Sequence, residues 1–243
     1  MEGKQQTATD LEWLSHLTVN DVSKIREILL NALANSEAFI SSNDILREFK
    51  ASKYLELGTK ELISKFLTIV DYRETPPVRK SFNLNSIQEE TLRKIETENG
   101  NIELLKARLE GISSILEAFC AVNAYLKKVE IIYVTPNRAL CEHSSKKILE
   151  FFEQMDVNMK LFPDKQLYDK KCHEEVRLSN GSRICFWPSS CAHMKFRGRR
   201  PDYVILDEYS FFNDEHRIIE AASISGGKVI STYTVSERKF EEK

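Results

Sequence analysis

Residues 203–208 read Tyr-Val-Ile-Leu-Asp-Glu, a short apolar run that ends in two adjacent carboxylates. Compact runs rich in Val and Ile are typical of strands that are buried on both faces of a parallel sheet. Ligands in such sheets bind at the carboxyl ends of the strands. Asp207 is therefore placed to hold Mg²⁺, and Glu208 to orient or deprotonate a water that attacks a γ-phosphate. The alternative interpretation is a strand that ends in a solvated acidic turn.

Strand patterns alternate with helix patterns from residue 81 onward. Apolar runs predict strands at 102–106, 129–135, 203–207 and 228–232, and helical periodicity predicts helices at 113–126 and 137–155. Asn180-Gly181 predicts a hairpin turn between two further strands. The alternation predicts an α/β fold with a mostly parallel sheet flanked by helices.

The first part of the chain shows helix patterns without the alternating strands. Helical periodicity predicts three helices, at residues 20–34, from Ser41 onward, and at 58–70, and the Pro76-Pro77 pair predicts a linker after them. We therefore expect a small helical domain at 1–75 and an α/β domain at 81–243. Residues 1–80 hold 11 Lys/Arg and 12 Asp/Glu, so a lid or assembly role is at least as well supported as a helix-turn-helix that reads DNA.

Composition limits the function classes. The 243 residues are 42% hydrophobic and 30% charged with a net charge of −2, which is ordinary for a globular protein and argues against nucleic-acid binding by bulk charge alone. No apolar run approaches the roughly 20 residues that a membrane span needs, so no membrane partner is expected. Five cysteines without a Cys-x-x-Cys pair favour a reducing compartment.

A second motif lies between the predicted strand at 102–106 and the helix that follows it. Residues 106–113 read Lys-Ala-Arg-Leu-Glu-Gly-Ile-Ser, to be compared with the phosphate loop G-x-x-x-x-G-K-[ST]. Gly111 and Ser113 take the second-glycine and hydroxyl positions, but Ile112 stands in place of the lysine. Backbone N–H groups at a helix start bind phosphate whatever the side chains. The alternative is an ordinary strand-to-helix turn.

The order of motifs resembles the ATPase domain of large terminase subunits, the DNA-packaging motors of tailed bacteriophages and herpesviruses. The resemblance covers roughly residues 81–234. It implies a fold of the P-loop NTPase (ASCE) type. The motifs that carry it are, in chain order, Gln88, Gly111-x-Ser113, Thr135-Pro136, the hairpin at 180–184, Arg197-Gly198, Asp207-Glu208 and Ser231-Thr232.

This resemblance implies a role for individual residues. Glu208 would be the catalytic carboxylate, with Arg108 acting at the phosphates, and Asp207 and Ser113 would hold the metal. Gln88 would contact adenine, and Lys106 would replace the missing lysine from the start of the loop. The nucleotide-binding set would be Gln88, Lys106, Arg108, Gly111, Ile112, Ser113 and Ser114, and the motif that couples hydrolysis to movement would comprise Ser231, Thr232 and Thr234.

One loop is strongly basic. Lys195, Arg197, Arg199 and Arg200 crowd six residues of a near-neutral protein. Clustered cations suit a nucleic-acid backbone because phosphate contacts carry no sequence information. We expect this loop to contact DNA or a neighbouring subunit, with a solvated loop as the alternative.

The resemblance also implies cofactors and partners. ATP and Mg²⁺ would be the cofactors, and the partners would be double-stranded DNA, the portal or procapsid, and the small terminase subunit. The motor would be a homo-oligomeric ring when assembled and a monomer alone. It would work in the host-cell cytoplasm, or in the nucleus if the virus is eukaryotic. Terminases carry a nuclease domain after the ATPase, and the nine residues after Thr234 are too few for one.

Two other hypotheses remain open. A helicase-like DNA translocase also carries a strand-terminal Asp-Glu and a Thr-Pro after a strand, although its further motifs and second motor domain are not recognisable here. A non-catalytic DNA-binding or assembly module with a decayed nucleotide site is supported mainly by Ile112. Nucleotide affinity with and without Mg²⁺ separates this last hypothesis from the others.

Overall fold

The computed structural model describes residues 17–34, 42–71, 75–162 and 166–234. The chain divides into two compact units between Lys53 and Tyr54. The first unit contains α2 (Val19–Ala34) and most of α3 (Ser42–Leu55). Thr18 and Asp21 cap α2 reciprocally, each backbone N–H bonding to the other side chain at 2.9 and 3.3 Å, and Asp21 also pairs with Lys53 of α3 at 3.1 Å.

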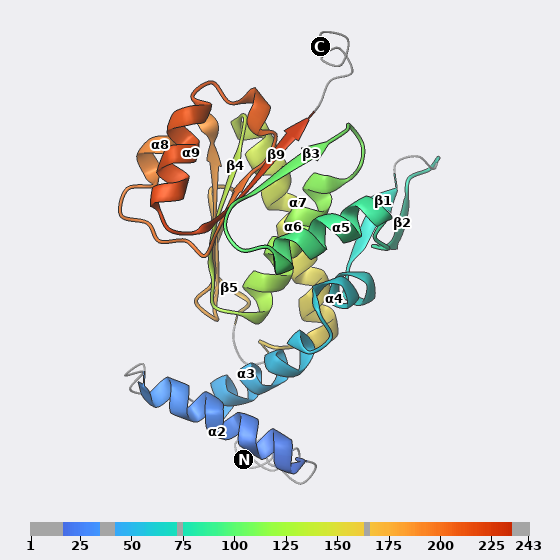
Figure 1. Ribbon diagram of the computed structural model, residues 1–243. Coiled ribbons are helices and arrows are strands. Elements are labelled where there is room, and N and C mark those ends of the chain that lie inside the picture. Colours follow the sequence, from blue (N-terminus) through green and yellow to red (C-terminus); the bar gives the residue numbers. More distant parts are fainter. Residues whose placement is uncertain (1–16, 35–41, 72–74, 163–165, 235–243) are drawn as a thin grey trace. The chain divides into compact units, whose positions relative to one another are not determined.

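A seven-stranded sheet forms the centre of the second unit (Figure 1). Its strands lie in the spatial order β3-β9-β8-β4-β7-β6-β5. The first five strands in this order are parallel, and β6 and β5 continue the sheet in antiparallel fashion. The strands are β3 (Ile102–Lys106), β4 (Glu130–Thr135), β5 (Tyr168–Cys172), β6 (Glu175–Leu178), β7 (Arg183–Pro188), β8 (Tyr203–Leu206) and β9 (Lys228–Thr234).

Helices cover both faces of this sheet. The helices α5 (Ser86–Thr97), α6 (Ile112–Leu126) and α7 (Arg138–Met159) lie on one face, and α8 (Ser189–Lys195) and α9 (Glu215–Ile224) lie on the other (Figure 1). Alternate residues of β4 point to opposite faces of the sheet. Ile132 and Val134 pack into the core under α8 and α9. This two-sided burial explains the continuous apolar runs of β4 and β8. Among the described residues, no helix is long and apolar enough to cross a membrane.

The predicted strands and helices of this part are confirmed, with small differences at their ends. The helix predicted at 137–155 continues to Met159, and the last strand continues to Thr234. Asn180-Gly181 joins β6 and β7 as expected, and Gly181 adopts the φ of 86° that such a turn requires. The predicted α/β fold, a mostly parallel sheet flanked by helices, is thus the observed one.

The helix predicted at 58–70 is wrong in its last four residues. Helix α4 (Thr59–Phe66) ends where Leu67 turns extended, and Thr68–Asp71 forms strand β1, paired with β2 (Val78–Ser81). The β-branched run Thr68-Ile69-Val70 favours a strand once a partner is present. Pro76-Pro77 lies in the connection between these two strands.

Helix α4 belongs to the second unit because it buries apolar residues there. Leu62 and Ile63 are fully buried, and α4 packs against α6 and α7. The two compact units therefore divide between Lys53 and Tyr54. The expected domains, 1–75 and 81–243, have their boundary later in the chain. That boundary stays a prediction of where the chain can be separated.

Candidate nucleotide-binding site

Four neighbouring parallel strands bring polar residues to one edge of the sheet. Lys106 ends β3 beside Thr234 of β9, and Ser231 of β9 pairs in register with Leu206, the residue before Asp207. Strand β4 adds Tyr133 from the other side of β8. This edge is the carboxyl end of the parallel sheet, where ligands bind in open α/β folds.

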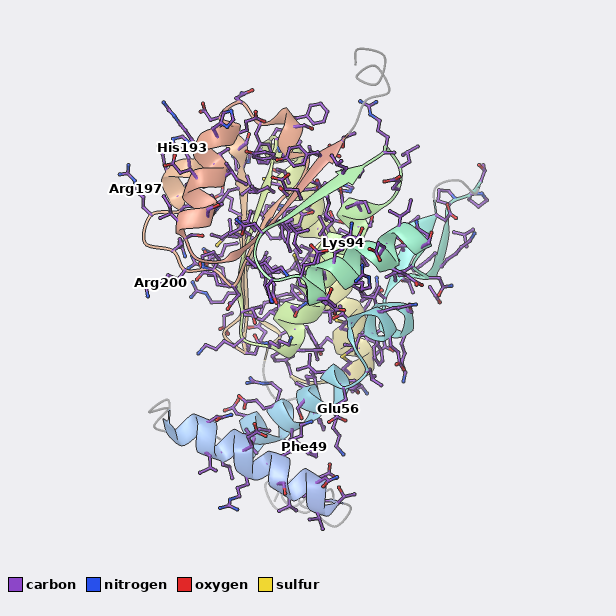
Figure 2. All side chains as sticks on the ribbon, in the orientation of Figure 1. Phe49, Glu56, Lys94, His193, Arg197 and Arg200 are labelled. Atoms are coloured by element: carbon purple, nitrogen blue, oxygen red, sulfur yellow. The ribbon has the colours of Figure 1, made fainter. Side chains whose placement is uncertain are left out.

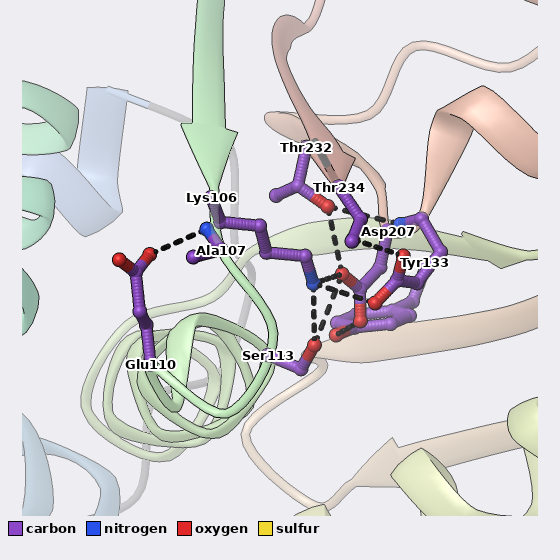
Figure 3. Close-up of polar contacts among 9 residues, drawn as sticks. Lys106, Ala107, Glu110, Ser113, Tyr133, Asp207, Thr232 and Thr234 are labelled. Carbon is purple, nitrogen blue, oxygen red and sulfur yellow. Dashed lines mark hydrogen bonds and ion pairs between the residues drawn. The ribbon is translucent and has the colours of Figure 1, made fainter. Parts of the chain in front are cut away.

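Asp207 is the centre of the polar cluster. Its Oδ1 accepts hydrogen bonds from Lys106 Nζ at 3.0 Å, Ser113 Oγ at 3.1 Å and Thr232 Oγ1 at 2.9 Å, and its Oδ2 accepts one from the Tyr133 hydroxyl at 3.1 Å (Figure 3). The side chain is 7% exposed, so these donors offset the loss of water around a charged group. Burial and the negative charge of Asp207 raise the pKa of Tyr133 well above its ordinary value, so its hydroxyl remains a donor.

Lys106 enters the cluster from the start of the loop. Its ammonium lies 3.0 Å from each of three oxygens, on Ser113, Asp207 and Glu208, and its side chain is 5% exposed. Arg108, by contrast, is exposed and lines the cavity outside this cluster. Of the two cations expected near the phosphates, Lys106 is the one that the structure brings to the acids.

Glu208 adopts an unusual backbone conformation. Its φ of 59° and ψ of 42° lie in the left-handed region, which costs a residue with a Cβ about 1–2 kcal/mol. The Thr232 hydroxyl accepts the Glu208 N–H at 2.9 Å, and the Thr234 hydroxyl donates to the Glu208 carboxylate at 2.5 Å. Such strained residues concentrate at functional sites, where surrounding contacts hold them.

The expected coupling residues separate into two groups. Thr232 and Thr234 contact the two acids directly, whereas the Ser231 hydroxyl donates to the Ile102 carbonyl at 3.3 Å and is buried in the sheet. Alternation along a strand explains the division, because residues two apart point to the same face.

The loop between β3 and α6 is shaped by two left-handed residues. Leu109 has a φ of 68° and Gly111, which precedes α6, has a φ of 75°. Glu110 folds back so that its carboxylate accepts the Ala107 N–H at 2.9 Å (Figure 3). Ile112 is 3% exposed, so the residue at the usual lysine position packs into the protein.

Gln88 joins this loop to the start of α5 through hydrogen bonds. Its Oε1 accepts the Asn85 N–H at 3.0 Å, and its Nε2 donates to the Gly111 carbonyl at 3.1 Å. A Cβ at position 111 would lie 2.5 Å from that Nε2, and the φ of 75° would strain any residue that carries one, so both features favour glycine. Asn85, which the sequence interpretation missed, donates to the Glu110 carbonyl at 3.3 Å. The pattern Asn-x-x-Gln at a helix start, a capping box, was the signal for this pair.

A cavity of about 790 Å³ opens beside the loop, within the range of small-molecule sites. Its walls combine the loop with residues that follow β4 and β8 and with Thr234 at the end of β9. The lining residues that matter most here are Lys106, Ser113, Ser114, Leu140, Glu208 and Phe211.

The residues present fit a magnesium nucleotide. The Ser113 hydroxyl and the Asp207 carboxylate are oxygen ligands of the kind that Mg²⁺ prefers, and the 3.1 Å between them leaves both within reach of a single ion or its water shell. The N-terminus of the 15-residue helix α6 faces the cavity and offers N–H groups to phosphate oxygens.

The basic loop does not belong to this cavity. Arg197 and Arg200 are exposed, on the same side of the second unit as His193 (Figure 2). Arg199 pairs with Glu130 at 3.2 Å, and the Lys195 ammonium lies 5.8 Å from the Trp187 ring centre. Arg197 and Arg200 are therefore the members best placed to contact a partner.

Comparisons with known proteins agree with this architecture. No protein-family model matches the chain, and no curated protein matches it by sequence. Among solved structures, the large terminase ATPase domain of Thermus phage P74-26 matches with a TM-score of 0.50 and 16% identity, covering 63% of this chain and 65% of that one. The HK97 bacteriophage large terminase matches with a TM-score of 0.51 and 12% identity, covering 72% of this chain and 36% of that one.

The chain therefore has the fold of a large terminase ATPase domain. The aligned part spans about two thirds of the P74-26 chain and about one third of the HK97 chain. At these identities the likeness concerns the fold. What the site does has to be argued from its own residues.

Proposed function

We propose that this chain is a Mg²⁺-dependent ATPase of the terminase type, whose ATP hydrolysis drives double-stranded DNA into a procapsid. The observation that supports it most is the position of Lys106. Although the usual lysine is replaced by Ile112, a buried ammonium reaches the Ser113 hydroxyl and both acids at 3.0 Å. An inert strand-to-helix turn has no need of such a cluster.

Each residue of the cluster then has a chemical role. Ser113 and Asp207 would hold Mg²⁺, which when bound offsets charge on the phosphate oxygens. Lys106 would bind phosphate oxygens, and Arg108 would contact them from the cavity wall. Glu208, whose carboxylate is 30% exposed, would take a proton from the attacking water. Thr232 and Thr234 would transmit structural changes at Asp207 and Glu208 to β9 through their hydrogen bonds.

The partners follow from the same proposal. DNA, the portal of the procapsid, the small terminase subunit and further copies of this chain in a ring would be partners, with the host-cell cytoplasm or nucleus as the compartment. The exposed Arg197 and Arg200 suit a contact with DNA phosphates or a neighbouring subunit. The role of the N-terminal helices, as lid, assembly element or helix-turn-helix, stays a prediction.

The decisive experiment measures ATP binding and hydrolysis by the purified chain with and without Mg²⁺. We expect Mg²⁺-dependent phosphate release that exceeds the background of an Asp207→Asn variant. Binding and hydrolysis that are both absent, in a chain with a cooperative thermal transition, would instead support the non-catalytic module with a decayed site. Stimulation by double-stranded DNA would support translocation.

Gln88 offers a separate prediction about the base. Both ends of its amide hold the loop and the start of α5, so Gln88→Ala should loosen the phosphate loop. We expect ATP and GTP affinities to fall by the same factor, about threefold to tenfold, as for the loss of one or two hydrogen bonds. Titration of both nucleotides into Gln88→Ala and Asn85→Ala measures this. A loss confined to ATP would instead support the adenine contact that the resemblance implies.

A further inference from the structure

A second cavity of about 220 Å³ lies beside the two acids and shares Ser113, Ser114 and Glu208 with the larger one. Its walls are formed by α6, the end of β4, and α7. They include four residues to which the proposed function gives no role, namely Glu117, His143, Ser144 and Lys147. The shared lining residues place this second cavity next to the proposed phosphate site.

Lys147 brings a positive charge to the region that the two cavities share. It lies on α7, and its Nζ donates to the Ser114 hydroxyl at 3.0 Å. Ser114 directly follows the metal-holding Ser113 in the first turn of α6 and lines both cavities. The Lys147 ammonium is therefore hydrogen-bonded to a residue of the loop that would surround the phosphates.

The cations of the cluster do not offset the negative charge that a bound triphosphate would add. Lys106 carries one positive charge, and its ion-pair partners Asp207 and Glu208 carry two negative charges. A triphosphate adds further negative charge, and phosphate loops normally meet it with a side-chain cation besides the metal. Ile112 contributes none.

Glu117 feels the charge of Lys147 but forms no close ion pair with it. No ion pair within 4.0 Å joins these two residues, both of which the structure describes. Burial raises the pKa of Glu117 to about 8, against the opposing charge of Lys147. Burial thus disfavours the charged form of this carboxyl beside Lys147.

We infer that Lys147 binds the terminal phosphate of a nucleoside triphosphate in this site. From α7 it adds a second side-chain cation, besides Lys106, to a phosphate loop that has Ile112 at the usual lysine position. The inference rests on the proposed function, because it needs a nucleotide in the larger cavity. A lysine has a long stem with rotatable bonds, so its ammonium can exchange the Ser114 hydroxyl for a phosphate oxygen.

The test compares a diphosphate with a triphosphate. The purified chain and its Lys147→Met variant are titrated with ADP and with the non-hydrolysed ATP analogue AMP-PNP, both with Mg²⁺. We expect Lys147→Met to weaken AMP-PNP binding about tenfold or more, the effect of losing a charge-assisted contact, and ADP binding by less than about twofold. Lys147→Arg should recover part of the AMP-PNP affinity. The control is Lys146→Met, which removes a neighbouring exposed lysine of the same helix and should bind both nucleotides as the parent does.

A double variant separates phosphate binding from a merely structural role. If Lys147 served only to balance Glu117, then Glu117→Gln with Lys147→Met would bind AMP-PNP as tightly as the parent. We expect the double variant to remain as weak as Lys147→Met. Thermal unfolding of each variant shows whether the fold is retained.

The outcomes keep the two proposals apart. A parent chain that binds both nucleotides while Lys147→Met retains parental affinity for AMP-PNP overturns the inference alone. Equal losses of ADP and AMP-PNP overturn it too, because they assign Lys147 to supporting the loop through Ser114. A folded parent that binds neither nucleotide overturns the proposed function and this inference with it.

Discussion

The Glu208→Gln variant should bind Mg²⁺ and ATP nearly as the parent does and hydrolyse ATP about 10²–10⁴-fold more slowly, the range expected for loss of a general base. Glutamine has the shape of glutamate and tolerates the same backbone conformation, so the Thr232 contact with the Glu208 N–H is retained. Its amide oxygen can still accept from Thr234. What it lacks is the basic oxygen that takes a proton from water.

Single-turnover hydrolysis and equilibrium binding measure the two quantities separately. Glu103→Gln is a suitable control, because Glu103 is an exposed glutamate of β3 outside the lining of either cavity at this edge of the sheet. Unchanged turnover in Glu208→Gln would remove Glu208 from the chemistry. Loss of ATP binding together with turnover would mean that its ion pair with Lys106, rather than its basicity, is what matters.

The sheet and its acidic edge could be predicted because their signals are local. The apolar runs of β4 and β8 are continuous since both faces of these strands are buried. Asp207 and Glu208 directly follow such a run, so their place at the carboxyl end of a strand needed no knowledge of the partners. Lys106 could be suggested from its place at the start of the phosphate-loop motif, and the structure shows it as the last residue of β3.

The residues that the sequence did not reveal act across distances in the chain. Tyr133 reads as one apolar member of a buried strand, and only the parallel register of β4 with β8 brings its hydroxyl to Asp207. Lys147 and Ser114 meet because α6 and α7 pack together. A weak signal existed for Glu117, since it is the only charged residue of helix α6, but no local pattern identifies its neighbours.

The hairpin β1–β2 was missed for a different reason. A run of four residues such as Thr68–Asp71 is too short for its apolar period to distinguish a strand from the last turn of a helix. Pairing with residues 78–81 decides the matter, and a sequence pattern does not contain that pairing.

The second large effect is expected at Lys106. Lys106→Ala leaves the buried carboxylate of Asp207 without its ion-pair partner, and removing one partner of a buried pair costs about 3–5 kcal/mol of folding free energy. It also leaves two adjacent acids facing an incoming triphosphate, so we expect Mg²⁺-ATP affinity to fall at least about tenfold. Thermal unfolding and nucleotide titration measure the two effects. Lys146→Ala, on the exposed side of α7, is the control.

A double variant shows which effect belongs to the fold and which to the ligand. Lys106→Ala combined with Asp207→Asn removes both charges of the pair, so much of the lost stability should return, by about 2 kcal/mol or more. ATP affinity should not return, because neither the cation nor the metal-holding carboxylate is present. Arg108→Ala should lose less affinity than Lys106→Ala, since Arg108 is exposed and lies outside the acidic cluster. Lys106→Ala could instead bind ATP as the parent does, or Arg108→Ala could lose more ATP affinity than Lys106→Ala. Either result would mean that the side of the loop that carries Arg108 holds the phosphates. The buried ammonium would then serve only to neutralise Asp207 and Glu208.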